Sequence, residues 1–424
     1  MKTLKVVLIG AGCRGRIYTN EMIGKNFEIV GVAEPLETPR EYIRKTHNVP
    51  EDKCFDTWEK LLELPKFADI AIISTQDSLH YAPAMKAIEQ GYNLLIEKPV
   101  APTPEECADI YNFAKEKGVK ALVCHVLRYT LFFGKIKELI MTGKLGKVLS
   151  VHHSECVGNV HQSHSYVRGN WRNTAESSNM LLAKSCHDVD IIQWLVDSDY
   201  KKASSFGSLT HFVRENAPEG SPEFCIDGCP HADTCYYNAV KLYLDAKEDH
   251  WFREAATKSV KPSDELVEQA LRTTNYGRCV YKCDNDVVDH QVVNYEFENG
   301  AVASFNMCCF NKGGRYIRIM GTDGEVYGDM EENTLKYYDF KTKEETIINP
   351  SEGTLDVTLV GGHGGGDSGI VNSLYEYIAN DVEDVCLSEI GISVKNHLAT
   401  FAAEEARLNG TVMDIKEYEN KYLK

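Results

Sequence analysis

The sequence predicts two domains: an α/β domain with a doubly wound parallel sheet, followed by an α+β domain with a mostly antiparallel sheet. Up to His125, apolar strands alternate with amphipathic helices, a pattern typical of a parallel sheet covered by helices on both faces. Farther on, period-two alternation and an Asn-Gly turn take over, and these features indicate antiparallel hairpins. We expect the two domains to cover residues 1–125 and 126–424.

The composition argues against several classes of partner. The chain has 424 residues and a formal net charge of −17, whereas a nucleic acid or an anionic membrane would need a basic face. No apolar run approaches the ~20 residues of a membrane span, and the N-terminus enters a strand without a signal-peptide pattern. We expect a cytoplasmic protein whose 14 cysteines are thiols or metal ligands.

The first strand and the loop after it indicate a dinucleotide site. The apolar run 5–9 stops at Gly10, and Gly12 and Gly15 complete a G-x-G-x-x-G spacing. The first glycine allows a tight turn, the second lets a pyrophosphate approach the backbone, and the third lets the next helix pack closely. That helix, expected over 15–25, directs unpaired N–H groups toward phosphate. The predicted cofactor loop comprises Gly10, Gly12, Cys13, Arg14 and Gly15. We expect it to belong to a Rossmann fold.

Glu34 predicts which dinucleotide binds. It ends the second predicted strand, 27–33, and lies 19 residues beyond Gly15, close to the ~20 expected for a carboxylate that bonds the adenosine ribose. A carboxylate there repels the 2′-phosphate of NADP, so NAD is favoured. The alternative for Glu34 is an exposed acid at a strand end. Three basic residues leave NADP open as the less favoured cofactor: Arg14, Arg16 and Arg40.

Helices and strands alternate through the rest of the first domain. We predict helices over 41–47, 58–64, 81–90 and 104–117, and strands over 68–74, 92–96 and 120–125. The segment 75–80 and Lys98 each follow a strand, and ligands of open α/β sheets bind along the carboxyl edge of the strands. The further cofactor contacts expected there are Ser74, Thr75, His80, Glu97 and Lys98.

Three motifs together resemble one enzyme family. G-A-G-C-R-G, I-I-S-T-Q-D-S-L-H and I-E-K-P-V are similar to those of the glucose–fructose oxidoreductase, inositol dehydrogenase and MocA family, and the resemblance covers essentially the whole chain. It implies that Lys98, flanked by Glu97 and Pro99, lies beside the nicotinamide and the substrate hydroxyl. It also implies a sheet whose outer face forms an oligomer interface, so we expect a homodimer or homotetramer. Without the other motifs, Lys98 would be an exposed lysine before a helix-starting proline.

The second domain opens with a segment suited to binding. A helix over 132–143 and a strand over 148–156 precede residues 161–172, H-Q-S-H-S-Y-V-R-G-N-W-R, which show no apolar period. Aromatic rings there suit a sugar face, and guanidinium groups suit oxygens or a carboxylate. The alternative is a solvated loop. The expected substrate contacts are Tyr129, His164, Tyr166, Arg168, Trp171 and Arg172.

The helix expected over 180–195 carries the predicted proton acceptor. Lys184 and His187 are three residues apart and share a face. Oxidation of an alcohol needs a base of near-neutral pKa, which imidazole provides. We predict that His187 accepts the proton and that Lys98 polarises the oxygen, with Lys184 as its alternate. Many members of the resembled family carry an acid four residues before the histidine, but this chain has Ala183.

Residues 206–290 read as an elaboration rich in cysteine. Three or four thiolates suffice for a structural zinc site. Cys225, Cys229 and Cys235 lie close together and are followed later in the chain by Cys279 and Cys283. The predicted zinc ligands are the first three of these with either Cys279 or Cys283. The alternative is that the cysteines pack as small apolar residues. A catalytic metal is not expected.

The C-terminal part predicts a sheet and two helices. A hairpin turns at Asn299-Gly300, and further strands are expected over 314–320, 325–328, 334–338 and 346–348. The glycine-rich segment 361–367 then leads into a helix over 369–380. His363 is an expected substrate contact, as is Asp367, although a helix-capping loop explains them equally. The helix expected over 393–408 is taken as the last one, packed against the first domain.

These features predict an NAD-dependent oxidoreductase that transfers a hydride between the nicotinamide and a hydroxyl-bearing carbon of a sugar, sugar acid or cyclitol. One alternative is an NAD-dependent glycosidase that works by oxidation, elimination, hydration and re-reduction. Another is a cofactor-bound sensor without turnover. The expected partner is a small carbohydrate-type molecule.

Overall fold

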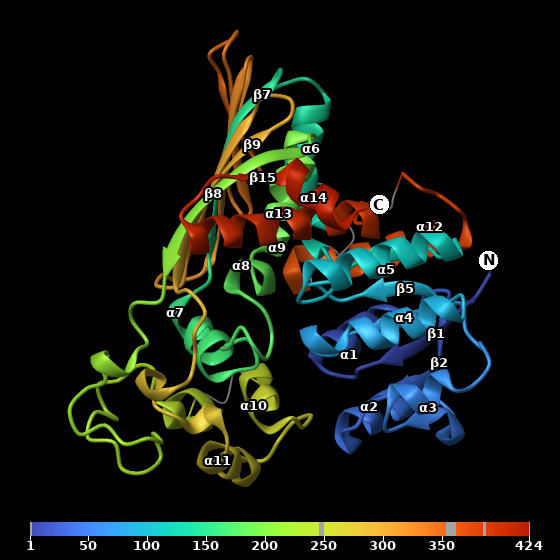
Figure 1. Cartoon of the computed structure of the whole chain (residues 1–424), viewed down its shortest axis with the longest axis vertical. Coiled ribbons are helices and arrows are strands. Elements are labelled where there is room, and N and C mark those ends of the chain that lie inside the picture. The colour runs from blue at the N-terminus through green and yellow to red at the C-terminus, as the bar shows by residue number, and fades with distance from the viewer. Residues whose placement is uncertain (1, 246–249, 353–361, 385–386, 424) are drawn as a thin grey trace.

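The computed structural model describes residues 2–245, 250–352, 362–384 and 387–423. Its first domain is built on a six-stranded sheet in the order β3-β2-β1-β4-β5-β6 (Figure 1), and every strand pair in it is parallel. This confirms the predicted Rossmann sheet. The strands are β1 Leu4–Ile9, β2 Phe27–Ala33, β3 Cys54–Phe55, β4 Ile70–Ile73, β5 Asn93–Ile96 and β6 Ala121–Val123.

Five helices of this domain follow the predicted alternation. They are α1 Cys13–Glu21, α2 Glu37–His47, α3 Trp58–Leu62, α4 Tyr81–Glu89 and α5 Pro104–Lys117. Helix α5 begins where the Thr103 hydroxyl accepts the N–H of Glu106 and ends at Gly118 in the left-handed region, as its capping residues predict. Helix α2 begins four residues earlier than expected, because Pro39 falls in its first turn, where proline is tolerated.

The second domain holds a nine-stranded sheet in the order β14-β13-β12-β11-β7-β10-β9-β8-β15. Only the pair β7–β10 is parallel, so the mostly antiparallel sheet is confirmed. The hairpin β9–β10 turns at Gly300, whose φ is +84°. Strand β8 was not predicted and takes the first residues of the expected elaboration. The strands are β7 Val148–Cys156, β8 Tyr200–Ser208, β9 His290–Phe297, β10 Val302–Cys308, β11 Gly314–Gly321, β12 Gly324–Asp329, β13 Thr334–Asp339, β14 Glu345–Ile348 and β15 Met413–Asp414.

Helices from the second half of the chain return to the first domain. Helix α12 packs against α1, and α13 packs against α5 as well as β8 and α9. The helix expected over 393–408 is not the last, because α14 follows it. Outside the 206–290 elaboration, the helices of this half are α6 Leu131–Met141, α7 Asn159–His161, α8 Met180–Ala183, α9 Cys186–Val196, α12 Gly366–Ala379, α13 Ile390–Asn409 and α14 Ile415–Tyr422.

The two faces of the parallel sheet belong to different hydrophobic clusters. Val7 and Ile9 of β1 pack with α4 and α5, whereas the neighbouring β1 residues Val6 and Leu8 pack with α12. This alternation is what a strand buried on both faces produces. One layer that covers the first domain therefore comes from residues 366–379.

The elaboration after β8 has a small hydrophobic core of its own and contacts α1 of the first domain. Its helices α10 His250–Thr257 and α11 Asp264–Thr273 lie beside the blue first domain in Figure 1. Tyr243 and Phe252 are buried in its core. Arg16 of α1 forms an ion pair of 2.5 Å with Glu254 of α10, which joins the elaboration to the first domain. No helix in the described ranges is both long and apolar enough for a membrane crossing.

Candidate active site

The glycine loop has the geometry that a pyrophosphate requires. Gly10 has a φ of +89°, and a Cβ there would lie 2.7 Å from the backbone of Ser74. A Cβ at Gly15 would lie 2.2 Å from the Gly10 carbonyl oxygen, whereas Gly12 faces open space. Helix α1 has no side-chain cap and no acid in its first turn, so its N-terminal amides suit an anion. The loop fits a bound dinucleotide.

The Glu34 carboxylate is fixed at the end of β2. It accepts the N–H of Ala11 at 2.8 Å and that of Leu36 at 2.9 Å, and the residue is only 7% exposed. Of the three basic residues considered as compensation, Arg14 pairs with Glu97 and Asp367, and Arg16 pairs with Glu254. Arg40 donates to the neutral backbone carbonyls of Glu34 and Pro35, so its positive charge lies beside Glu34 without a carboxylate partner in these contacts.

The carboxyl ends of β4 and β5 are tied together. His80 Nδ1 lies 2.8 Å from the Pro99 carbonyl and its Nε2 lies 3.2 Å from the Thr75 carbonyl. The Ser74 hydroxyl donates to the Gly10 carbonyl at 2.7 Å, and the Lys98–Pro99 peptide is cis. Two predicted cofactor residues that follow β4 therefore have structural contacts: Ser74 bonds the glycine loop and His80 bonds the E-K-P turn.

Arg14 connects three segments that lie far apart in the sequence. Its Nε donates to Glu97 at 2.9 Å and its Nη2 donates to Asp367 at 2.6 Å. His363 Nδ1 lies 3.0 Å from the same Asp367 carboxylate. Burial raises the pKa of Glu97, but Arg14 and Lys98 outweigh burial and hold it below its ordinary value. The glycine loop, the E-K-P turn and the start of α12 therefore form one ionic cluster. Gly361 of the predicted glycine-rich segment lies outside the described residues.

Lys98 contacts the point where the predicted helix 180–195 breaks. That helix is in fact two, α8 and α9, separated by Lys184 and Ser185. Lys98 Nζ donates to the Ala183 carbonyl at 2.8 Å. Where the helix breaks, the Ala183 carbonyl loses its helical hydrogen bond and needs another donor. The Lys98 ammonium supplies that hydrogen bond. Position 183 is where the family resemblance led us to expect an acid. In this chain Lys98 bonds the backbone oxygen of Ala183 instead.

A carboxylate that sequence reasoning missed stands beside Lys184. Glu155 of β7 forms an ion pair with Lys184 at 3.0 Å and with Arg315 at 2.6 Å. Arg315 in turn bonds Asp188 at 2.8 Å, and Asp188 bonds His153 at 2.8 Å. Glu155 is buried. The signal for it lay in the period-two pattern of β7, which puts an acid on the same inward face as Val151 and His153.

His187 lies next to Lys98 in a cluster of imidazoles. Burial, with the nearby charge of Lys98, lowers the pKa of His187 well below its ordinary value. Its ring meets His125 edge to face at 5.6 Å, and His125 meets His397 at 5.5 Å. His187 is therefore neutral at physiological pH and can accept a proton, but it is a weaker base than the near-neutral one expected from the sequence. Its catalytic role stays a prediction.

Residues 161–168 of the segment 161–172 are helical and only 169–172 form turns, so the expected binding loop is corrected for most of its length. Residues 162–168 form a buried π-helix, because aromatic partners from the elaboration enclose them. His164 stacks on Phe252 at 3.9 Å and bonds the Tyr243 hydroxyl at 2.8 Å. Arg168 is 1% exposed and donates to the carbonyls of Arg278 and Tyr237, each at 2.8 Å. Both side chains fasten the elaboration in this structure and reach no open cleft.

The other predicted substrate residues are more dispersed. Trp171 Nε1 donates to the Asp77 carboxylate at 3.1 Å, and Tyr166 lies beside its ring with centroids 6.0 Å apart. Arg172 pairs with Glu176 at 2.9 Å and with Asp284 at 2.8 Å. The Tyr129 hydroxyl lies 3.0 Å from that of Ser388. Of this group, His363 is the side chain that combines substantial exposure, 44%, with a place in the Arg14 cluster.

The predicted zinc site is not formed. Among the described residues, no group of three or more His, Cys, Asp or Glu side chains is arranged to hold a metal ion. Cys225, Cys229, Cys235 and Cys279 do line one cavity, so these four cysteines lie close together in the fold as expected. Burial raises the pKa of the Cys235, Cys279 and Cys283 thiols, that of Cys283 to about 11.

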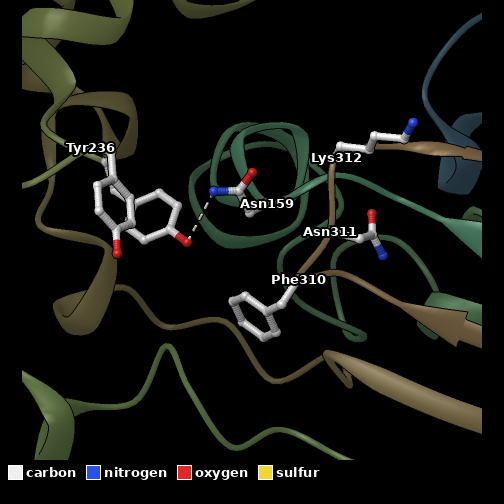
Figure 2. Close-up of a pocket in the computed structure, with 6 residues that line it drawn as sticks. Asn159, Tyr236, Phe310, Asn311 and Lys312 are labelled. Atoms are coloured by element: carbon white, nitrogen blue, oxygen red, sulfur yellow. Dashed lines mark hydrogen bonds between the residues drawn. The ribbon is translucent and has the colours of Figure 1, made fainter.

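A separate hollow of about 520 Å³ lies between the elaboration and the β10–β11 turn. Figure 2 shows Tyr236 on one side of it, Phe310 on another, and Asn159 between them. The Asn159 amide donates to the Tyr237 hydroxyl at 3.3 Å. None of the predicted site residues lines this hollow, so it does not mark the reaction centre.

Comparison with known proteins agrees with this geometry. A family model described as an oxidoreductase family with an NAD-binding Rossmann fold matches residues 4–125. A second model, described as the C-terminal alpha/beta domain of an oxidoreductase family, matches residues 137–394. The putative oxidoreductase YteT of Bacillus subtilis (strain 168) is 24% identical over 379 residues, which cover 84% of this chain and 83% of YteT.

Two further relatives have more specific names. Glucose-6-phosphate 3-dehydrogenase of Bacillus subtilis is 28% identical over 204 residues, 46% of this chain and 55% of that enzyme. The structure of levoglucosan dehydrogenase with NADH and levoglucosan has a TM-score of 0.70 at 17% identity, with 97% of this chain and 99% of that chain covered. This likeness shows a shared fold. With both family models matched in order along the chain, the protein belongs to the glucose–fructose oxidoreductase, inositol dehydrogenase and MocA family of NAD(P)-dependent oxidoreductases.

Proposed function

We propose that this protein is an NAD-dependent oxidoreductase that transfers a hydride between a hydroxyl-bearing carbon of a sugar, sugar acid or cyclitol and the nicotinamide. The observation that carries the proposal is the placement of Lys98, whose ammonium bonds the Ala183 carbonyl at 2.8 Å one helical turn before His187. Glucose-6-phosphate 3-dehydrogenase, scyllo-inositol 2-dehydrogenase and levoglucosan dehydrogenase, all similar to this chain, support the substrate class by their names.

The choice of NAD over NADP rests on Glu34. Its buried carboxylate follows the second strand, the position that holds the adenosine ribose in Rossmann domains, and a carboxylate there repels a 2′-phosphate. Arg14 and Arg16 do not relieve this repulsion, because each is paired with a carboxylate. Arg40, which bonds backbone carbonyls, is the cation that remains beside Glu34. We expect NAD to bind at least about tenfold more tightly than NADP, as one repulsive charge contact implies. Titration of the protein's tryptophan fluorescence with each cofactor measures the ratio.

The residues of the chain divide the chemistry between them. Bound NAD supplies the acceptor for the hydride that leaves the alcohol carbon. The Lys98 ammonium polarises the substrate oxygen and stabilises the negative charge that develops on it. The neutral His187 imidazole takes the hydroxyl proton. The ion pair between partly exposed Arg14 and buried Glu97 holds the E-K-P turn against the glycine loop.

A substrate screen tests the proposal. The purified protein is incubated with NAD and a panel of sugars, sugar acids, inositols and aryl glycosides, while NADH is followed by absorbance and the aglycone by release. NADH accumulation with a sugar or cyclitol is the expected result. Glycoside cleavage without net NADH would instead establish the glycosidase alternative, for which the Lys184–Glu155 pair offers a second proton-transfer group.

The sensor alternative predicts no chemistry at all. Transfer of deuterium from a C-deuterated substrate to bound NAD distinguishes it, because a sensor leaves the cofactor unlabelled. A panel-wide lack of labelled NAD, with NAD bound, would contradict the proposed oxidoreductase activity.

We also propose that the enzyme acts in the cytoplasm as a homodimer or homotetramer. Every cysteine in the described part of the chain is a free thiol, which suits a reducing compartment. Exposed apolar side chains on the nine-stranded sheet, including Phe206, Val302 and Tyr327, suit an interface. Light scattering gives the assembly mass, and a monomeric mass would contradict the oligomer. Cell fractionation tests the compartment.

A further inference from the structure

We propose that the substrate is an uncharged polyol, and that the site discriminates against sugars that carry a carboxylate or a phosphate. This inference rests on the proposed oxidoreductase function and narrows its substrate class. Anionic sugars are normally held by a free guanidinium or ammonium group in the cleft. The geometry points to a cleft in which these cations, except for Lys98, are already satisfied by the protein.

Five arginines from the predicted site and the elements that carry it are each bonded to other groups of the protein. Arg14 faces two carboxylates, those of Glu97 and Asp367. Arg315 also faces two, those of Glu155 and Asp188. The others are Arg128, bidentate to Asp190 at 2.7 and 2.8 Å, Arg172, paired with Glu176 and Asp284, and Arg168, sealed against backbone carbonyls.

Lys184 is neutralised as well. Its ammonium lies 3.0 Å from Glu155, and the same carboxylate reaches Arg315 at 2.6 Å. Glu155 and Asp188 are both buried, whereas Lys184 and Arg315 are partly exposed. Two cations and two anions therefore balance within one chain of contacts. A substrate anion that approached Lys184 would have to compete with a carboxylate that is already in place.

The imidazoles add no positive charge. Burial and the charge of Lys184 lower the pKa of His161 to about 3. Burial and the charge of Lys98 lower the pKa of His187 well below its ordinary value, and burial does the same for His125. These rings are neutral at physiological pH and offer hydrogen bonds suited to hydroxyl groups.

Lys98 bonds a neutral carbonyl rather than a carboxylate. Arg168 also bonds carbonyls but is buried, whereas Lys98 is partly exposed. Lys98 is also the group that polarises the reacting oxygen. A carboxylate or phosphate that paired with Lys98 would displace the hydroxyl, so an anionic sugar would bind unproductively. Placing such an anion elsewhere in the cleft would desolvate it without a counter-charge, which is costly.

The test compares matched pairs of substrates with the NAD-loaded wild-type enzyme. Glucose is compared with glucuronate and with glucose 6-phosphate, and galactose with galacturonate. We expect kcat/KM to be at least about tenfold higher for the neutral member of each pair. An anionic member that equals or exceeds its neutral partner overturns the inference and leaves the proposed function standing. If no member of any pair reduces NAD, the comparison is repeated with the substrate that the screen identifies and its carboxylate or phosphate derivative. A screen in which no sugar, sugar acid or cyclitol reduces NAD contradicts the proposed function itself.

Glu155→Gln probes the cause of the discrimination. The amide keeps the shape of the side chain but leaves the Lys184 ammonium without its carboxylate. We expect the ratio of kcat/KM for uronate to that for hexose to rise about tenfold. Glu155→Asp, which keeps the charge, should leave the ratio near the wild-type value, and so should the matched control Glu296→Gln, which breaks the exposed Lys201–Glu296 pair of 2.8 Å. A merely structural role would lower both activities together. If Glu155→Gln does not fold, the wild-type comparison decides alone.

Discussion

Asp367→Asn is the substitution that best tests the ionic cluster between the glycine loop and α12. Arg14 Nη2 and Asp367 Oδ1 are 2.6 Å apart, with side chains 27% and 2% exposed. Asparagine has nearly the same shape but no charge, so Arg14 keeps Glu97 as its only carboxylate. His363 loses its charged neighbour as well. We expect both stability and cofactor affinity to fall.

The size of the effect follows from burial. Breaking a fully buried pair costs about 3–5 kcal/mol, because a charge is left uncompensated. Here Arg14 retains Glu97 and some contact with water, so about 2 kcal/mol is the appropriate estimate. For a chain of this size that corresponds to a fall in Tm of about 2 °C. NAD affinity should fall about threefold or more, since Arg14 belongs to the loop that cradles the pyrophosphate.

The pH dependence has a definite sign. Burial raises the pKa of Asp367, but hydrogen bonds from His363 and Arg14 outweigh burial and hold it below its ordinary value. A depressed pKa in the folded state stabilises the protein above the unfolded-state pKa, and this stabilisation is lost as pH falls through the folded-state value. The Tm difference between wild type and Asp367→Asn should therefore be constant from pH 7 to about 5 and shrink below about 4.

Differential scanning fluorimetry from pH 7 to 3.5 measures these differences. Asp56→Asn is the matched control, because Asp56 pairs with Lys60 at 2.7 Å on an exposed helix end and surface pairs contribute about 0–1 kcal/mol. Our reasoning is refuted if Asp367→Asn shifts Tm no more than Asp56→Asn, or if its shift grows on acidification.

Three other substitutions test the site. Lys98→Met should lower turnover about 100- to 1000-fold, the effect of losing one preorganised donor, with NAD affinity nearly unchanged; loss of NAD binding in a folded variant would contradict the role assigned to Lys98. His187→Asn should lower turnover similarly, and wild-type kcat should show no titration near pH 6.5, since the pKa of His187 lies well below that value; a clear inflection there would refute a neutral acceptor. Glu254→Gln releases Arg16 from its ion pair. The ratio of kcat/KM with NADP to kcat/KM with NAD should then rise about fivefold, and an unchanged ratio would show that Arg16 does not reach the 2′-phosphate.

The parts of the fold that local patterns determine were predictable. The strand and glycine spacing of the first domain, the capped helix α5 and the Asn-Gly hairpin each depend on residues close in sequence. Family membership followed from the same motifs. Strand β8 escaped prediction because its residues Tyr200–Ser208, Y-K-K-A-S-S-F-G-S, mix lysines, serines and a glycine with few apolar side chains.

The site was predictable only in part, because its charges are balanced by long-range contacts. No local pattern shows that the helix breaks after Ala183, since the cause is Lys98, 85 residues away. The same holds for Arg168 and His164, whose residue types suit a ligand but whose partners come from residues 237–278. Polar composition alone does not distinguish a binding loop from a buried helix, because the two differ in what surrounds them.

The return of α12 to the first domain bears on how the protein is made. Val6 and Leu8 of the first strand share a hydrophobic cluster with Ile370 and Leu374. Tyr18 and Ile43 from α1 and α2 belong to the same cluster. A ribosome-bound chain that has emerged only to residue 125 would therefore expose to water the part of this face that α12 covers. We expect the nucleotide domain to mature after the substrate domain has been synthesised, even though it comes first in the sequence. The dinucleotide site would then be complete only in chains that have been synthesised through α12.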